Sequence, residues 1–411
     1  MLTSSGRLSQ ADTEPHPALA VFLAHFAGYF LRSESRHTFE RYLTGLLLEM
    51  PNKNCQTIAQ VVPNTTEQNL REFLTKASWK EDEVNEERIH QLKKLKTEGD
   101  GVLVLDDVSH LKKGNESVGV GRQWSGCAGK VENCQVIVTC VYAERTVMWP
   151  IDTRVYLPKE WTEDKKRRKK VHIPMFITFQ NKAQLALQLV KESIQYKVPF
   201  ACVVGDSWYG ENTGLLDSLE KLEKLYIFEV HKNMTIYPLG IETTGRAAED
   251  TWSKNNEKGW QTVKWRTGSK GPLEAKFKWK RYQRKTESGE MSEGWLLMEI
   301  TAEGHYEYYW SNFPKDATLK KVVEYAKRRH WIEQFHEEAK QELGWAEYQG
   351  RTWKGLLRHT VSVLMAYSFL VIEEVNQRES RKKQGRPRRP FSPSAGSKES
   401  LPGIAQKASG G

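Results

Sequence analysis

Two short apolar runs, each ending in an aspartate, constrain the fold of this chain more than any other feature. Residues 101–107 read GVLVLDD, and residues 200–206 read FACVVGD. Runs of this length and composition are typical of strands buried inside a sheet. Two more strand-like runs, 134–143 and 148–157, and a helical pattern at 181–196 lie between them. This order predicts an α/β domain with acidic side chains where its strands end.

The flanking segments have other patterns. Residues 17–98 carry apolar residues at helical spacing and predict a small helical domain, with a role in DNA binding or in structure alone. Residues 226–312 favour strands, and residues 319–342 are strongly helical. In chain order we expect a flexible N-terminus, the helical domain, the first part of an α/β core, a β-rich basic insertion, the second part of the core and a disordered basic tail: 1–16, 17–98, 99–225, 226–312, 313–375 and 376–411.

The positive charge of the chain is concentrated in two places. The formal net charge is +10. Residues 376–411 contribute nine Lys and Arg against two Glu, 9 − 2 = +7, and residues 254–285 contribute 11 − 2 = +9. The rest of the chain therefore sums to 10 − 7 − 9 = −6. An acidic body with two basic regions indicates a polyanionic partner such as DNA, and solvated surface with a disordered tail is the alternative.

One basic region contains a strand with alternating character, AKFKWKRYQRK at 275–285. Alternation places three lysines on one face and Phe277 with Trp279 on the other. We expect the lysine face to meet phosphate groups, and an ordinary exposed strand is the alternative. The lysines are Lys276, Lys278 and Lys280.

The cysteine content and the apolar runs favour a cytoplasmic protein. The five cysteines are odd in number and form no CxxC motif, so neither a disulfide framework nor a structural zinc site is expected. The first sixteen residues contain no apolar signal core. The longest uncharged apolar run, Thr360–Ile372, is shorter than the roughly twenty residues of a membrane span. We expect it to form a buried helix, with no membrane as partner.

Three acidic positions carry the predicted chemistry. One of Asp106 and Asp107 ends the first strand, Asp206 ends the later strand, and Glu333 lies beside the apolar stripe of the 319–342 helix. Carboxylates that converge are usually held together by divalent cations, and oxygen ligands suit Mg²⁺ or Mn²⁺. Taken singly, each such acid is more often a helix cap or a salt-bridge partner than a metal ligand.

Basic side chains on the same helix complete this pattern. Arg329 and Lys340 lie on the stripe of Glu333, at helical spacings from it. Both side chains suit phosphate oxygens. Glu337 shares the face of Glu333 and is the rival for the third acid.

Three blocks of the chain resemble a known family. Residues 106–138 read DDVSHLKKGNESVGVGRQWSGCAGKVENCQVIV, residues 203–210 read VVGDSWYG, and residues 328–359 read RRHWIEQFHEEAKQELGWAEYQGRTWKGLLRH. These blocks resemble, in the same order, those of bacterial insertion-sequence transposases of the DDE class. That group has a Tyr/Arg/Glu/Lys signature and a β-rich insertion before the catalytic glutamate. The resemblance covers about residues 67–372.

The resemblance implies a ribonuclease H-like core and an acidic triad of Asp107, Asp206 and Glu333, holding two Mg²⁺ or Mn²⁺ ions. It favours Asp107 over Asp106 as the first acid. In the signature, Arg329 and Lys340 match, whereas Tyr325 stands four residues before the arginine, where three are expected. Other residues are implied in DNA contacts: Lys112 and Arg122 with the backbone, and an aromatic such as Trp310 on a flipped base, although a packed β-core explains that aromatic cluster equally well.

The function implied by the resemblance is DNA transposition. The chain would bind the terminal inverted repeats of a mobile element, pair two ends as a homodimer, cleave DNA and join the 3′-hydroxyl ends to target DNA, in the bacterial cytoplasm at the nucleoid. A metal-dependent nuclease of the same fold that does not join DNA is one alternative. A catalytically inactive DNA-binding descendant is the other.

Overall fold

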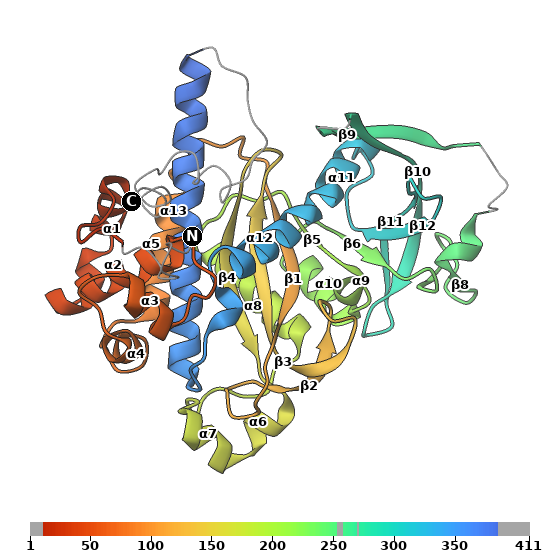
Figure 1. The fold of residues 1–411 in the computed structure, drawn as a ribbon. Coiled ribbons are helices and arrows are strands. Elements are labelled where there is room, and N and C mark those ends of the chain that lie inside the picture. The colour runs from red at the N-terminus through yellow and green to blue at the C-terminus, as the bar shows by residue number, and fades with distance from the viewer. Residues whose placement is uncertain (1–10, 253–257, 269–270, 385–411) are drawn as a thin grey trace.

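Helices on the N-terminal side, a large central sheet and a strand-rich extension make up the computed structural model (Figure 1). It describes residues 11–252, 258–268 and 271–384. Within this part the chain forms a mixed α/β fold with N-terminal helices, as the sequence predicted at this level. The expected flexible start and basic tail lie largely outside the described residues.

The N-terminal segment is helical, as its apolar spacing predicted. Polar side chains begin two of its helices: Asn54 accepts from the amides of Gln56 and Thr57, and Thr66 accepts from the amide of Asn69. Such caps satisfy amides that have no partner inside the helix. The helices are α1 (Pro17–Ala24), α2 (Ser33–Leu47), α3 (Cys55–Val61), α4 (Glu67–Thr75) and α5 (Glu81–Leu92), with a short 3₁₀ turn η1 (Ala27–Tyr29).

The central sheet combines antiparallel and parallel strands. Its hydrogen-bonded order is β2-β3-β1-β5-β6-β12-β11-β10-β9, and β4 also pairs with β3. Strand β1 is antiparallel to β3, whereas β1, β5 and β6 run parallel. The strands of the first half are β1 (Val102–Leu111), β2 (Gly121–Ser125), β3 (Lys130–Ala143), β4 (Met148–Tyr156), β5 (Cys202–Gly205) and β6 (Tyr226–Val230).

Helices connect and cover these strands. Parallel β1 and β5 need a crossover connection, which includes α8 packed on β3 and β4. The remaining helices follow the strands or lead toward the C-terminus. In chain order they are α6 (Lys159–Glu163), α7 (Lys165–Val171), α8 (Lys182–Gln195), α9 (Ser207–Gly210), α10 (Thr213–Lys221), α11 (Leu319–Ala326), η3 (Lys327–Arg329), α12 (His330–Gln341) and η4 (Trp345–Glu347).

The long helix α13 (Trp353–Lys383) joins the N-terminal helices to the sheet. It packs against α2, α4 and α5 on one side and β4 on the other. By length and composition it resembles a membrane span, yet 89% of its most apolar window is buried inside the protein. The run 360–372 thus forms the buried helix that the sequence predicted. The helix also continues to Lys383, into the segment expected to be a disordered tail.

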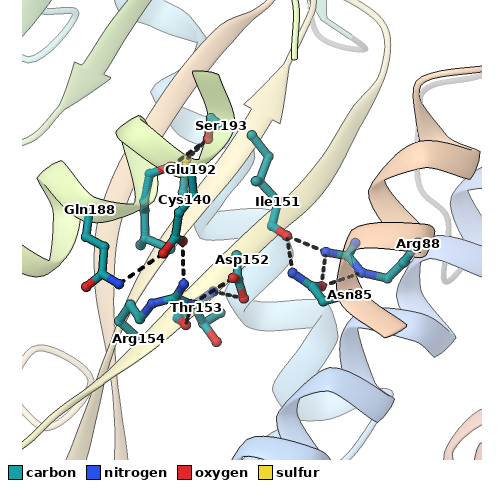
Figure 2. Close-up of polar contacts among 11 residues, drawn as sticks. Asn85, Arg88, Cys140, Ile151, Asp152, Thr153, Arg154, Gln188, Glu192 and Ser193 are labelled. Carbon is teal, nitrogen blue, oxygen red and sulfur yellow. Dashed lines mark hydrogen bonds and ion pairs between the residues drawn. The ribbon is translucent and has the colours of Figure 1, made fainter. Parts of the chain in front are cut away.

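Two arginines, the buried Arg88 and the half-buried Arg154, connect the layers (Figure 2). From α5, Arg88 donates to the carbonyl oxygens of Pro150 and Ile151 on β4. On the next part of β4, Arg154 pairs with Asp152 at 2.7 Å and with Glu192 of α8. The buried carbonyl groups and carboxylates therefore have donors, which a stable interior requires.

The expected insertion does not form a separate unit. Strand β12 pairs with β6, so the strands of this segment continue the central sheet. The first strand of the expected insertion, β6, itself belongs to the parallel part of the sheet. The extension contains β9 (Gln261–Gly268), β10 (Gly271–Lys285), β11 (Met291–Ile300) and β12 (Tyr306–Ser311), with a small pair, β7 (Thr235–Ile236) and β8 (Arg246–Ala247), beside a 3₁₀ turn η2 (Ala248–Thr251).

Strand β10 shows the predicted alternation. Phe277 is buried, and the Trp279 ring stacks on Trp295 with centroids 3.8 Å apart. On the other face, Lys276 and Lys280 are exposed and Lys278 is half-buried near the ring of Trp260. The stacking role considered for Trp310 is wrong in this conformation, because its side chain is fully buried in the core.

Candidate active site

Three acids lie side by side just beyond the point where the parallel pairing of three strands ends. Leu105 of β1 pairs with Gly205 of β5, and Gly205 pairs with Phe228 of β6. The next residue along each strand is Asp106, Asp206 and Glu229, respectively. The carboxylates therefore leave the sheet at one level, on neighbouring strands.

The backbone around Asp206 fixes this arrangement. Its Oδ1 accepts hydrogen bonds from the amides of Trp208 at 3.1 Å and Tyr209 at 3.3 Å, which begins α9 directly after β5. A side chain on Gly210 would place its Cβ 1.9 Å from the carbonyl oxygen of Glu229. Glycine at this position lets α9 lie against β6, beside the row of acids.

The acids perturb one another. Burial, together with the smaller effect of the nearby carboxylates of Asp206 and Asp107, raises the pKa of Asp106 to about 8. Burial also raises the pKa of Asp206 and of Glu229, with the cation of Arg329 opposing the shift in both. The three carboxyl groups therefore lie close together at a partly buried position, and a bound divalent cation would offset the repulsion between their negative charges.

Arg329 connects this row to the helix that follows it. Its Nε lies 3.1 Å from Oε1 of Glu229, and its Nη2 lies 2.9 Å from Oε1 of Glu333, one turn along the chain. Glu333 stands in the first turn of α12 and is 57% exposed. Glu333, the third predicted acid, is thus connected to the acidic row through the Arg329 guanidinium, which also contacts Glu229.

The two adjacent aspartates of β1 have different partners. Asp107 receives an ion pair from Lys182, at the start of α8, with 2.9 Å between Nζ and Oδ2. The charge of Arg329 acts on the pKa of Asp106 and of Asp206. The structure therefore places Asp106, and not Asp107, in the acidic row beside Asp206, although the resemblance favoured Asp107.

The oxygen donors present suit Mg²⁺ or Mn²⁺, and Asp106 with Asp206 fit such an ion by position and by charge. Glu333 is paired with Arg329 instead of joining them. Among the described residues, no three His, Cys, Asp or Glu side chains are grouped closely enough to hold a metal ion. Completing a ligand set with Glu333 would require its ion pair with Arg329 to rearrange.

Other predicted residues on α11 and α12 are more dispersed. Glu337 is exposed one turn beyond Glu333. Lys340 is half-buried near His110, where burial, Lys112 and Lys340 together hold the pKa of the imidazole below its usual range. Tyr325 is buried, and its ring packs against the ring of Phe313, so the side chain is not presented to solvent.

The predicted DNA contacts of the first block are mainly structural. Lys112 donates to the carbonyl oxygens of Ala346 and Tyr348, at 3.0 and 2.9 Å, so the predicted phosphate contact is wrong in this conformation. Arg122 is exposed and donates to the carbonyl oxygen of Val131 at 3.3 Å. Its guanidinium remains accessible to a phosphate.

Sequence reasoning missed Glu229 and Lys182. Glu229 follows the apolar run YIF at 226–228, which repeats the pattern of a short buried strand with an acid after it, so the same signal was available. Lys182 opens a helix far from Asp107 in sequence, and only the crossover of α8 brings the two together.

The family follows from comparison with known proteins. Residues 25–272 match the DDE superfamily endonuclease family, which is more than half of the chain. This chain belongs to that family. Residues 180–369 also match the transposase DDE domain. The DDE endonucleases are enzymes, and the segments that match include the acidic row and α12.

One curated relative agrees with this assignment. The chain is 23% identical over 348 residues to "Probable transposase for insertion sequence element IS701" from Microchaete diplosiphon, covering 82% of this chain and 84% of that one. It is also similar to a cryo-EM structure of a piggyBac transposase synaptic complex with hairpin DNA, with a TM-score of 0.47, 10% identity and coverage of 97% and 81% of the two chains. The predicted identity, a DDE transposase of insertion-sequence type, is thus confirmed at the level of the family.

Proposed function

We propose that this chain moves a DNA element by metal-dependent cleavage of phosphodiester bonds and joining of the freed 3′-hydroxyl ends to target DNA. The observation that carries this proposal is the row of acids just beyond the parallel pairing of β1, β5 and β6, to which Glu333 is connected by the guanidinium of Arg329. The family match supports transposition as the context for that chemistry.

The fold supports a ribonuclease H-like catalytic core. Antiparallel β4, β3 and β1 lie next to parallel β5 and β6, and the acids leave the parallel strands at their carboxyl ends. Ligands of open α/β sheets bind at such strand ends. The basic face of β10 supports DNA as the partner. We propose the element ends and target DNA as the substrates, and a homodimer as the working assembly.

Asp106 and Asp206 would hold the divalent ions, with Glu333 as the third ligand. Two bound ions would supply an activated water and stabilise the leaving oxygen. Arg329 holds Glu333 beside the row and would donate to a phosphate oxygen when Glu333 turns toward Asp106 and Asp206. Lys182 would act as a positioning residue that keeps Asp107 turned toward α8. We place the protein in the bacterial cytoplasm, at the nucleoid.

The neighbouring aspartates of β1 test this assignment. Asp106→Asn, Asp206→Asn and Glu333→Gln should each lower Mg²⁺-dependent nicking of element-end DNA by more than about 100-fold, beyond the range typical of residues that only support a metal ligand. Asp107→Asn is the matched control and should cost no more than about that range. End binding in EDTA should persist in all four variants.

Three results would contradict the proposal. If nicking survives Asp206→Asn, the acidic row is not the catalytic site. If Asp107→Asn lowers nicking more than Asp106→Asn does, the first catalytic acid is Asp107. A pre-nicked end incubated with target DNA and Mg²⁺ should give a joined product, and repeated hydrolysis without joining would favour a nuclease of the same fold.

A further inference from the structure

Six consecutive basic residues, 165–170, lie outside the site described above. They form helix α7, which Asp164 begins by accepting from the amides of Lys166 and Arg167, both at 2.9 Å. The helix ends at His172, whose φ of +59° stops the helical path. The like charges in such a run repel one another, and runs of this kind often bind a partner of opposite charge.

The two arginines of the run face the protein. The Arg167 guanidinium lies 3.7 Å from the ring centroid of Trp161 and donates to the carbonyl oxygen of Asn115 at 2.8 Å. Arg168 donates to the carbonyl oxygens of Thr162 and Pro174, at 3.0 and 2.6 Å. These contacts fix α7 on the loop that follows β1.

The four lysines face away from the protein. At about 100° per residue, Lys165, Lys166, Lys169 and Lys170 lie within an arc of roughly 140°, opposite buried Val171. All four are exposed, and Lys170 pairs with Glu116. Within the described residues, the other three have no acidic group within 4.0 Å. The helix thus presents an ordered face of cations, which we call the α7 lysine face.

This face belongs to the same edge of the sheet as the acids. Beyond Asp107, β1 continues to Leu111 and then enters the loop that carries Asn115 and Glu116, on which α7 rests. Four strand residues span about 13 Å, which is roughly four base pairs of duplex DNA. On its other side, the chain runs from α7 to Lys182, whose ammonium pairs with Asp107. Figure 1 shows α6 and α7 projecting from the central sheet, away from the N-terminal helices.

We propose that the α7 lysine face binds the phosphates of duplex DNA at least four base pairs, roughly, from the cleaved bond. This inference rests on the proposed function, because it places the scissile phosphate at the acidic row. Lysines act as point charges without the planar fork that reads bases, so the contact would position DNA without selecting its sequence. Rigid attachment through Arg167 and Arg168 would hold the phosphates at a fixed distance from the acids.

The test removes three charges and compares two places on the surface. The variant Lys165→Gln/Lys166→Gln/Lys169→Gln removes the lysines without an acidic partner. Its matched control, Lys93→Gln/Lys94→Gln/Lys96→Gln, removes three exposed lysines just before β1, at the opposite end of that strand from α7. Both variants should unfold at the temperature of the unaltered protein, because none of these side chains is buried.

Binding is measured in EDTA by fluorescence anisotropy, using duplexes that span the junction between an element end and its flank, taken from the DNA adjoining the coding sequence. For the α7 variant, the slope of log K against log salt concentration should become shallower by about 2 to 3, since each lost phosphate contact removes about 0.9. Affinity near 0.1 M salt should fall by roughly 10- to 100-fold. The control variant should change neither quantity to this extent.

Shortening the duplex then locates the contact. On DNA trimmed to fewer than about four base pairs beyond the cleaved bond, on the side that reaches α7, the variant and the unaltered protein should bind equally. Equal salt slopes for the α7 and control variants would overturn the inference, and so would a difference that persists on trimmed DNA. If the unaltered protein neither binds nor nicks the full duplex, the proposed function fails instead.

Discussion

Because of His359 on α13, we expect low pH to destabilise the contact between the N-terminal helices and the core. The side chain is fully buried, with Nδ1 2.8 Å from the hydroxyl oxygen of Tyr42 and Nε2 3.1 Å from the carbonyl oxygen of Trp345. A carbonyl only accepts, so Nε2 carries a hydrogen. In the neutral imidazole, Nδ1 accepts from the Tyr42 hydroxyl. Burial lowers the pKa of this imidazole to about 4, against the opposing effect of the hydrogen bond to Trp345.

The magnitude follows from the difference between the folded and unfolded pKa values. An unfolded histidine has a pKa of about 6.5, so the unfolded chain takes up the proton first as pH falls. The stability linked to His359 is complete above about pH 6.5 and is lost progressively toward pH 4. The total is about 3.4 kcal/mol, from roughly 2.5 pKa units at about 1.36 kcal/mol each, and lowering the pH from 7 to 5 should remove about 2 kcal/mol of it.

Urea unfolding at pH 7 and pH 5, followed by tryptophan fluorescence and circular dichroism, measures this loss of unfolding free energy. His359→Gln should be less stable at pH 7, yet its free energy of unfolding should fall by about 2 kcal/mol less between the two pH values than that of the unaltered protein. His37→Gln, an exposed change on α2, is the control and should keep the full loss. Identical losses in the unaltered protein and His359→Gln would refute the neutral, buried imidazole.

Two further substitutions test the packing around the site. Gly210→Ala would place a methyl group against the carbonyl oxygen of Glu229, so α9 must move from β6. The melting temperature should fall by an amount equivalent to about 1–3 kcal/mol, with a loss of nicking, and an unchanged melting temperature would show that the contact relaxes freely. Arg88→Met should cost more than about 3 kcal/mol in urea unfolding, because the carbonyl groups of Pro150 and Ile151 lose their buried donors; a neutral effect would mean that water replaces the guanidinium.

The sequence predicted the parts of the site that depend on local pattern. Runs of buried residues before Asp106 and Asp206 indicated buried strands followed by acids, and the parallel pairing of β1 with β5 brings these two aspartates to the same level. The choice between Asp106 and Asp107 could not be made from alternation alone. It depends on which face of β1 meets Lys182 and which meets Arg329, and both partners arrive from distant segments.

Long-range contacts also explain the residues whose predicted roles differ. Lys112 follows a strand in a basic stretch, which resembles a phosphate contact, but the loop at Ala346 and Tyr348 supplies carbonyl acceptors for it. Trp310 lies among aromatic residues, which suits either base stacking or a core. Pairing of β12 with both β6 and β11 puts it in the core, and no local signal specifies that pairing.

The pairing of β12 with β6 has a consequence for how such a chain can change over time. An inserted segment that folded as a separate domain could be shortened or lost without disturbing the central sheet. Here its final strand covers the edge of β6, whose preceding residues pair with β5 and whose Glu229 meets Arg329. Deleting 235–311 would leave that edge bare, and unpaired edges recruit other chains. A shorter descendant would therefore have to keep β12 or acquire another strand in its place before the rest could disappear.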